Sequence, residues 1–252
     1  MNKKLSTKIS IFLLALSAVF TSCQDDNDGI SLRPTALVTV KPTAESFILQ
    51  LDDSTRLVPA NMTKSPFGDK EVRALVNYKI EKKDNKYSSA HISCIDQSVH
   101  INWIDSIRTK MAVPSLGSDI DILTYGNDPV EIVNDWVTVA EDGYLTLRTR
   151  TLWGYPGNVH YLNLVTGVNP ENPFELELRH DARGDVGVSW GDALIAFNLR
   201  DVLKNATSDE VKFTLRWHSF SGTKKIEFGM KSKPMDTRCN LDETTEFNQN
   251  VK

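Results

Sequence analysis

Cysteine is scarce in this chain, which has three among its 252 residues: Cys23, Cys94 and Cys239. A count this low excludes the disulfide-dense scaffolds found among small exported domains. Cys94 lies in an alternating, strand-like run and Cys239 in a polar segment, so we expect both to be free thiols. A disulfide between them stays open as the alternative, because sequence alone cannot show that two cysteines meet.

Positive charge is also in short supply. The chain carries 29 basic and 33 acidic side chains, a formal net charge of −4. Removal of residues 1–22 as an export signal, argued below, takes away three lysines and leaves a net charge of −7. Proteins that bind nucleic acid need a basic face against the phosphates, so we expect no nucleic-acid partner.

Motifs for catalysis or metal binding are missing. The five histidines are scattered, without the spacing of a zinc site. No G-x-S-x-G motif marks a nucleophilic serine, and neither later cysteine has an obvious partner. We therefore expect a non-enzymatic protein with no metal and no cofactor other than a covalent lipid. The histidines are His91, His100, His160, His180 and His218.

Long apolar runs are absent too, and the run Ile9–Phe20 is informative. Its 12 uncharged residues follow three lysines, and it is too short for a transmembrane helix but typical of a secretory signal. The following Phe20-Thr21-Ser22-Cys23 resembles a bacterial lipobox. We therefore expect residues 1–22 to be a lipoprotein signal peptide and Cys23 to carry acyl chains that anchor the chain in a membrane. An ordinary secreted protein is the alternative.

Acidic residues follow Cys23 closely, after Gln24. Asp25, Asp26 and Asp28 lie in a polar tether, residues 23–33. Acids in this place resemble the surface-export signal of Bacteroidota lipoproteins. The expected location is therefore the outer membrane, lipid-anchored, with the body of the protein facing the cell exterior. A solvated spacer in the periplasm is the alternative.

The rest of the chain reads as all-β, in two series of strands. The first series, within residues 34–112, predicts a five-stranded, OB-like closed barrel. Its expected strands are Ala36–Val40, Phe47–Leu51, Val72–Ile80, His91–Ile95 and Val99–Ile107. Met111–Ile122 has no clear period and is expected to be a linker in which Asp119 and Asp121 are solvated.

The second series, within residues 113–232, alternates between apolar and polar residues and predicts an antiparallel β-sandwich. Asp201–Lys204 is expected to form one helical turn, and residues 233–252 a disordered polar tail. The expected strands are Trp136–Val139, Tyr144–Trp153, Val159–Val165, Phe174–His180, Leu194–Leu199, Val211–Phe220 and Lys225–Met230.

Several short motifs resemble the NigD-like lipoproteins of Bacteroidota, in order and spacing over roughly residues 30–232. This resemblance implies an N-terminal OB-type domain and a C-terminal β-sandwich, and it implies no catalytic residues. Two segments, Trp153–Gly157 and Val186–Trp190, look particular to this member. The motifs are Leu75–Tyr78, Tyr125–Val130 (YGNDPV), Asp142–Leu145, Phe174–Asp181 (FELELRHD) and Ala196–Leu199.

Aromatic residues in the sandwich turns give the candidate binding surface. If the strands run up and down, the turns at 154–158, 181–193 and 219–224 emerge at one end. Trp153, Tyr155 and Trp190 would then lie beside Arg183 and Asp185, as a shallow platform for sugar rings or a partner protein. The alternative, which we favour for single rings, is that these aromatics fold down and cap the core.

Two further features of this end are expected to be structural. His180 shares the apolar phase of its strand, so we expect a hydrogen-bonded core residue rather than a general base. The loop carboxylates Asp181, Asp185 and Asp192 could offer oxygen ligands to Ca²⁺, but the EF-hand spacing is absent and a solvated turn is favoured.

Three functions remain open. The first is a surface-anchored, non-catalytic binding lipoprotein that takes a glycan or a protein. The second is a protective or immunity-type factor of a bacteriocin-like system, suggested by the locus for which the NigD-like family is named. The third, a hydrolase, is disfavoured by the missing catalytic groups.

Overall fold

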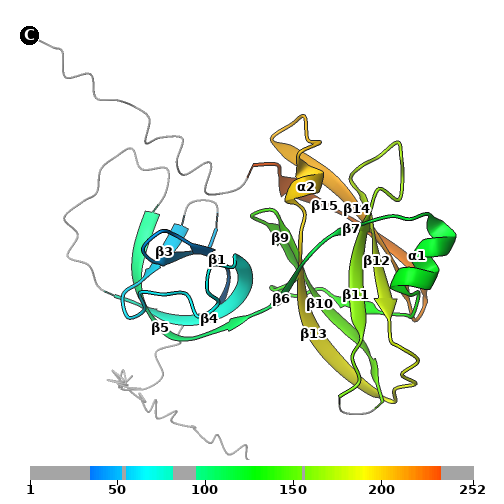
Figure 1. Ribbon diagram of the computed structural model, residues 1–252, viewed down its shortest axis with the longest axis horizontal. Helices are drawn as coiled ribbons and strands as arrows, with labels where there is room; N and C mark the ends of the chain where they lie inside the picture. Colours follow the sequence, from blue (N-terminus) through cyan, green and yellow to red (C-terminus); the bar gives the residue numbers. More distant parts are fainter. Residues whose placement is uncertain (1–34, 53–54, 82–94, 155–156, 234–252) are drawn as a thin grey trace, which may run out of the picture. The chain divides into compact units, whose positions relative to one another are not determined.

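The computed structural model describes residues 35–52, 55–81, 95–154 and 157–233, all within one compact unit, Arg33–Lys252 (Figure 1). No helix in these ranges is long and apolar enough to cross a membrane. Several predictions concern residues outside these ranges: those for Cys23, Asp25, Asp26, Asp28, His91, Cys94, Tyr155, Cys239 and the C-terminal tail.

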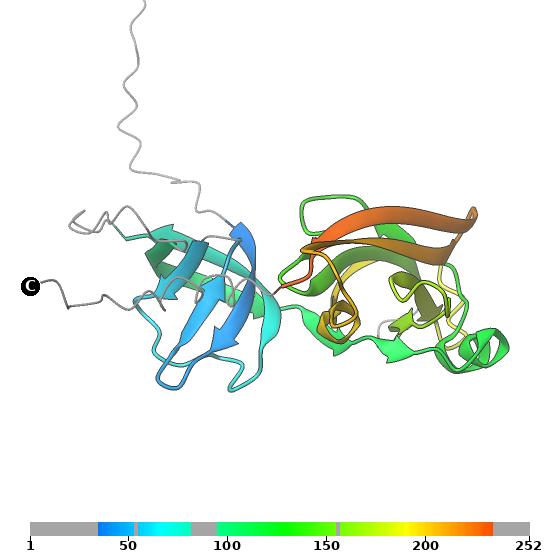
Figure 2. The same cartoon turned by 90° about the horizontal axis from the view of Figure 1, so that it is seen from above.

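Five strands close the N-terminal barrel in the order β1-β2-β3-β5-β4, shown in blue to cyan and green in Figure 2. Apolar side chains that alternate along these strands fill its interior, among them Val38, Val40, Phe47 and Leu49. Neighbouring strands are antiparallel except for the parallel pair β3–β5. The strands are β1 (Thr35–Pro42), β2 (Phe47–Gln50), β3 (Thr55–Pro59), β4 (Val72–Ile80) and β5 (Ile95–Ser106).

The predicted count of five barrel strands is right, but one of the five strands was not predicted. Thr55–Pro59 supplies β3, which the sequence analysis had missed. The run predicted over His91–Ile95 lies outside the described residues except for Ile95, the first residue of β5. A strand of five residues, two of them polar, is too short to show a clear alternation of apolar and polar positions. Strand β3 is held in the barrel by pairing on both sides, with β2 and β5.

Two sheets pack face to face to form the C-terminal sandwich. One has the order β6-β13-β10-β8, with β9 also paired to β10, and the other has the order β15-β14-β12-β11-β7. Most neighbours are antiparallel, and β6–β13, β7–β11 and β12–β14 are parallel. The strands are β6 (Arg108–Met111), β7 (Val113–Pro114), β8 (Glu131–Val133), β9 (Val139–Glu141), β10 (Tyr144–Trp153), β11 (Tyr161–Thr166), β12 (Glu175–Asp181), β13 (Ser189–Asn198), β14 (Glu210–Ser219) and β15 (Gly222–Lys231).

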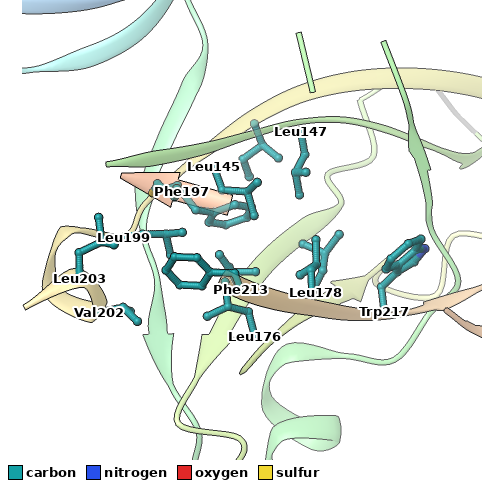
Figure 3. Close-up of a cluster of buried hydrophobic side chains, with 14 of the residues drawn as sticks. Leu145, Leu147, Leu176, Leu178, Phe197, Leu199, Val202, Leu203, Phe213 and Trp217 are labelled. Atoms are coloured by element: carbon teal, nitrogen blue, oxygen red, sulfur yellow. The ribbon is translucent and has the colours of Figure 1, made fainter. Parts of the chain in front are cut away.

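The core of the sandwich follows the predicted alternation. Figure 3 shows Leu145, Leu147 and Phe197 of one sheet facing side chains of the other, such as Leu178 and Phe213. The short helix α2 (Arg200–Leu203), predicted as a helical turn, adds Val202 and Leu203 to the same cluster. Burying a side chain of this size contributes roughly 1.5–3 kcal/mol, so this cluster is the main stabilising element of the domain.

Two segments of the sandwich correct the sequence analysis. The predicted linker Met111–Ile122 contains β7 and the start of helix α1 (Ser118–Tyr125). Asp121 is buried rather than solvated, because its carboxylate accepts hydrogen bonds from the Ser115 hydroxyl and the Leu116 amide. The strand predicted over Trp136–Val139 begins only at Val139, as β9, and Trp136 lies exposed in the preceding turn.

Candidate functional site

The motif Tyr125–Val130 begins at the last residue of helix α1 and runs across the end of strand β12. Gly126 has φ +85°, and a β-carbon there would lie 2.3 Å from the carbonyl oxygen of His180. The close approach lets the Asp128 amide donate to that same carbonyl at 2.8 Å, while its carboxylate accepts from the Ala182 amide at 2.7 Å. The glycine therefore lets this motif lie against His180.

Three consecutive hydrogen bonds join Pro129, His180, His160 and Asp185. Nδ1 of His180 lies 3.1 Å from the Pro129 carbonyl oxygen, and its Nε2 lies 3.0 Å from Nδ1 of His160. Nε2 of His160 lies 3.1 Å from a carboxylate oxygen of Asp185. His180 is 2% exposed, and the side chains of His160 and Asp185 are each 3% exposed. We call these three side chains the His–Asp chain.

Trp153 covers the His–Asp chain. Its indole stacks on the His160 ring, with centroids 3.9 Å apart and planes inclined by 19°. The next residue, Gly154, donates its amide to the Asp185 carboxylate at 2.9 Å. Gly187 passes so close that a β-carbon would lie 2.3 Å from the Trp153 backbone, so the loop between β12 and β13 folds back onto the end of β10.

Burial and hydrogen bonding shift the pKa values of two members of the His–Asp chain. Burial lowers the pKa of His180, which opposes a second proton on that ring. The Gly154 amide, followed by the contact with His160, lowers the pKa of the Asp185 carboxyl against the opposing effect of desolvation. A neutral His180 and an ionised Asp185 are therefore favoured.

Exposed apolar side chains lie next to this buried chain. Val186, Val188 and Trp190 are 87%, 85% and 57% exposed, and the Trp190 ring meets the half-exposed Phe220 ring edge to face at 4.9 Å. We call these four residues the apolar patch. A cavity of about 130 Å³ adjoins the patch, and its lining includes His180, Asp185, Val186 and Phe220. Trp190 contacts Phe220, and Val186 lines the same cavity as Phe220, and a local gathering of exposed apolar side chains is typical of a binding surface.

The predicted platform residues separate into two groups. Trp153 folds down over His160, and its backbone contacts the loop that carries Asp185. Trp190 stays exposed and pairs with Phe220. Arg183 has φ +55° and places its guanidinium 5.6 Å from the centre of the Tyr161 ring, while Tyr155 lies outside the described residues.

Sequence reasoning missed His160 as the partner of His180. The five histidines are far apart in sequence, and Asp185 was predicted only as part of the platform and of the loop carboxylates, not as a partner of a histidine. The strand register explains the contact: β11 pairs Leu162 with His180 and Tyr161 with Asp181, so the residue preceding β11 lies beside the end of β12. The expectation that His180 is a hydrogen-bonded core residue agrees with its two bonds.

The three loop carboxylates do not converge. Asp181 accepts from the amide of Arg183, Asp185 belongs to the His–Asp chain, and Asp192 pairs with Arg148 and Arg150 on the sheet surface. The hydrogen bond from Arg150, together with the charge of both guanidinium groups, lowers the pKa of Asp192 to about 2. Within the described ranges no three His, Cys, Asp or Glu side chains form a set that could hold a metal.

Comparisons with known proteins match both domains. Residues 37–107 match the NigD-like N-terminal OB domain and residues 113–230 the NigD-like C-terminal beta sandwich domain. The comparison with curated proteins found no match. A crystal structure from Parabacteroides distasonis, provisionally described as a toxin-related protein, is 28% identical with a TM-score of 0.65, over 83% of this chain and 98% of that one.

Two more distant structures share the fold alone. A NigD-like immunity protein from Bacteroides caccae is 18% identical with a TM-score of 0.52, over 79% of this chain and 93% of that one. A Bacteroides fragilis protein provisionally described as a lipoprotein is 12% identical with the same TM-score, over 80% and 98% of the two chains.

Proposed function

Because the chain belongs to the NigD-like family, whose two domains it contains in order, we propose that it is a lipid-anchored, non-catalytic binding protein of the outer membrane. Its body faces the cell exterior, and its ligand is a protein that docks on the apolar patch. The observation that carries this proposal is the exposure of four apolar side chains over a buried, fully hydrogen-bonded support.

The composition of the patch favours a protein over a glycan. Sugar rings stack on flat aromatic faces, whereas Trp190 and Phe220 meet edge to face and their neighbours are two valines. The nearby carboxylates are already engaged, Asp185 by His160 and Asp192 by two arginines, so they are poorly placed to receive sugar hydroxyls. Apolar side chains of a protein partner fit this surface better.

The His–Asp chain does not suit catalysis. One end is the Asp185 carboxylate and the other is the backbone carbonyl of Pro129, so a nucleophile occupies neither end. The side chains of His160, His180 and Asp185 are also almost fully buried. A general base must reach the proton that it removes, and we infer that this group supports the patch instead.

The anchor is tested by Cys23→Ala. We expect wild-type protein to stay with the outer membrane and to incorporate an acyl label, and the variant to lose both properties, because several buried acyl chains anchor a protein durably. Protease treatment of intact cells tests the orientation. A wild-type chain fully protected from protease would contradict the exterior location, and a membrane-bound, labelled Cys23→Ala would contradict the anchor.

The binding surface is tested by a photo-crosslinking side chain introduced at Val188 in living cells. We expect one discrete adduct with a second polypeptide, and Trp190→Ala should lower its yield about tenfold or more, as loss of an aromatic anchor does. Trp136→Ala is the matched control, because Trp136 is 59% exposed in the same domain but lies outside the patch. A yield that is unchanged by Trp190→Ala, or a glycan-array signal that this variant abolishes, would overturn the choice of a protein ligand.

A protective role against a toxin is the second candidate function. It is favoured by two of the similar structures, one described as an immunity protein and the other, provisionally, as toxin-related. A protective factor would also use a protein-binding patch. Deleting the gene should then sensitise cells to the toxin of a sister strain, and the Trp190→Ala protein should fail to restore resistance.

A further inference from the structure

The His–Asp chain constrains where its protons lie. The carbonyl oxygen of Pro129 can only accept a hydrogen bond, so Nδ1 of His180 must carry a proton. An ionised Asp185 also only accepts, so Nε2 of His160 must carry a second proton. Between the two rings, Nδ1 of His160 and Nε2 of His180 lie 3.0 Å apart, and one of them needs a third proton.

The three hydrogen bonds therefore need three protons. An ionised Asp185 and two neutral imidazoles supply only two, and two lone pairs would then face each other at 3.0 Å in a buried site. The count is the same if the carboxyl of Asp185 holds the extra proton, because a protonated acid would donate to His160. Completing the chain thus always takes up one proton relative to the mildly alkaline state.

We propose that the His–Asp chain takes up this one proton as a unit as the pH falls, and that the proton holds the patch-bearing loop in its folded-back position. The patch then binds its protein partner more tightly in mild acid than in mild alkali. This regulation rests on the proposed function, since it acts on the same surface.

The groups around the chain assign the third proton to the His160 ring. His180 stays neutral because it is buried, and Asp185 stays ionised because the Gly154 amide and His160 donate to it. The His160 ring then donates on both sides, to a carboxylate and to a neutral imidazole. Three other charged or titratable groups at this end, Asp128, Asp181 and Arg183, bond or stack elsewhere. A fourth, His218, contacts the Asn127 carbonyl.

The direction of the pH effect follows from the proton count. Lowering the pH supplies the third proton, so in mild acid the His–Asp chain is complete and the loop is closed. As the pH rises, the proton leaves and the contact between the rings is lost. The lowered pKa of Asp185 keeps its carboxylate ionised well into the acid range, so the closed loop is lost there only as the pH falls through that lowered value.

Closure of the loop can be measured without any ligand, by hydrogen exchange at two of its amides. The amide of Asp185 donates to the Ala182 carbonyl at 2.9 Å, and the amide of Val188 donates to the Trp153 carbonyl at 3.0 Å. Hydrogen exchange at these two amides, corrected for the intrinsic pH dependence, should be about tenfold more protected at pH 6 than at pH 8, as expected for loss of one charge-assisted hydrogen bond. Ring ¹⁵N spectra of the same full chain should show three ring protons at pH 6 and two at pH 8.

Two variants separate this device from simple structural support. His160→Gln cannot take up a third proton, and in Asp185→Asn the amide can donate to His160, so both should lose the pH dependence of protection. His218→Gln, which alters a neighbouring histidine outside the chain, should keep it. If both variants fail to fold, the wild-type ring spectra still decide. Two neutral rings beside Asp185 at pH 6, or a pH dependence that His160→Gln leaves unchanged, would overturn the proposal.

The effect of pH on partner binding is measured as the yield of the crosslink from Val188 at pH 6 and at pH 8. We expect a severalfold higher yield at pH 6 in wild type and equal yields in Asp185→Asn. A wild-type yield that does not change with pH would overturn the regulation even if the rings titrate. Absence of an adduct at both pH values would count against the proposed function instead, while the ring spectra test the proton count independently.

Discussion

Replacing Arg73 with methionine is expected to lower the free energy of unfolding by about 3 kcal/mol. Arg73 lies in β4, is 1% exposed, and donates to the hydroxyls of Thr39 (2.8 Å) and Thr146 (3.3 Å) besides its ion pair with Glu141. These partners lie in β1, β10 and β9, so one side chain joins barrel strands to sandwich strands. Methionine fills a similar volume but leaves two buried hydroxyls and a carboxylate without their donor.

The size of this effect is set by burial. Loss of one partner of a buried pair costs about 3–5 kcal/mol, and the lower value applies because part of the Glu141 side chain reaches water. Urea denaturation followed by tryptophan fluorescence measures the change. The control is Arg56→Met, which breaks the exposed pair with Asp96 and should cost at most about 1 kcal/mol. Equal losses in the two variants would show that burial of Arg73 contributes nothing.

Replacing Gly126 with alanine should cost roughly 3 kcal/mol and should also disturb the His–Asp chain. The positive φ of this residue strains any L-residue, by about 1 kcal/mol or more. The added β-carbon would also lie 2.3 Å from the His180 carbonyl oxygen and 2.6 Å from two Asp181 carbons. Two of these three atoms, the His180 carbonyl oxygen and the Asp181 Cα, belong to the strand backbone, which cannot move alone, so overpacking adds about 1–3 kcal/mol.

Replacing a second glycine, Gly68, is the control that separates backbone strain from steric crowding. Gly68 also has a positive φ, +64°, but a β-carbon there meets nothing within 4 Å. Gly68→Ala should therefore cost about 1 kcal/mol, and only Gly126→Ala should shift the ring signals of His180, whose Pro129 acceptor follows the glycine closely. Comparable losses in the two variants, with unchanged His180 signals, would refute the close packing of this motif against β12.

The regular strands could be predicted where one face is buried. Val72–Ile80 and Tyr144–Trp153 were placed at their observed bounds, because alternation of apolar and polar residues over nine or ten positions is a local property. The family motifs YGNDPV and FELELRHD were also visible in sequence. Their structural meaning was not, because Gly126 matters only through its distance to the backbone of another segment.

Elements defined by their neighbours escaped prediction. β3, β6 and β7 are short and each takes part in a parallel pair, with β5, β13 and β11 respectively. Parallel pairing joins segments that are distant in sequence, so a strand of two to five residues carries no internal pattern that reveals it. Helix α1 was not predicted either, since Gly117 at its N-cap and Pro114 in the preceding strand β7 are typical of a linker.

The all-β class, the order of barrel and sandwich, and the resemblance to NigD-like proteins could be predicted from sequence, because these depend on patterns among contiguous residues. The sequence also led to the prediction of a lipid on Cys23. The contacts of His160 with His180 and Asp185, the stacking of Trp153 on His160, and the exposed pair of Trp190 and Phe220 were found only in the folded structure. Those contacts depend on the register of β11 against β12 and on a loop that folds back onto β10, and no local pattern encodes a distance between separate segments.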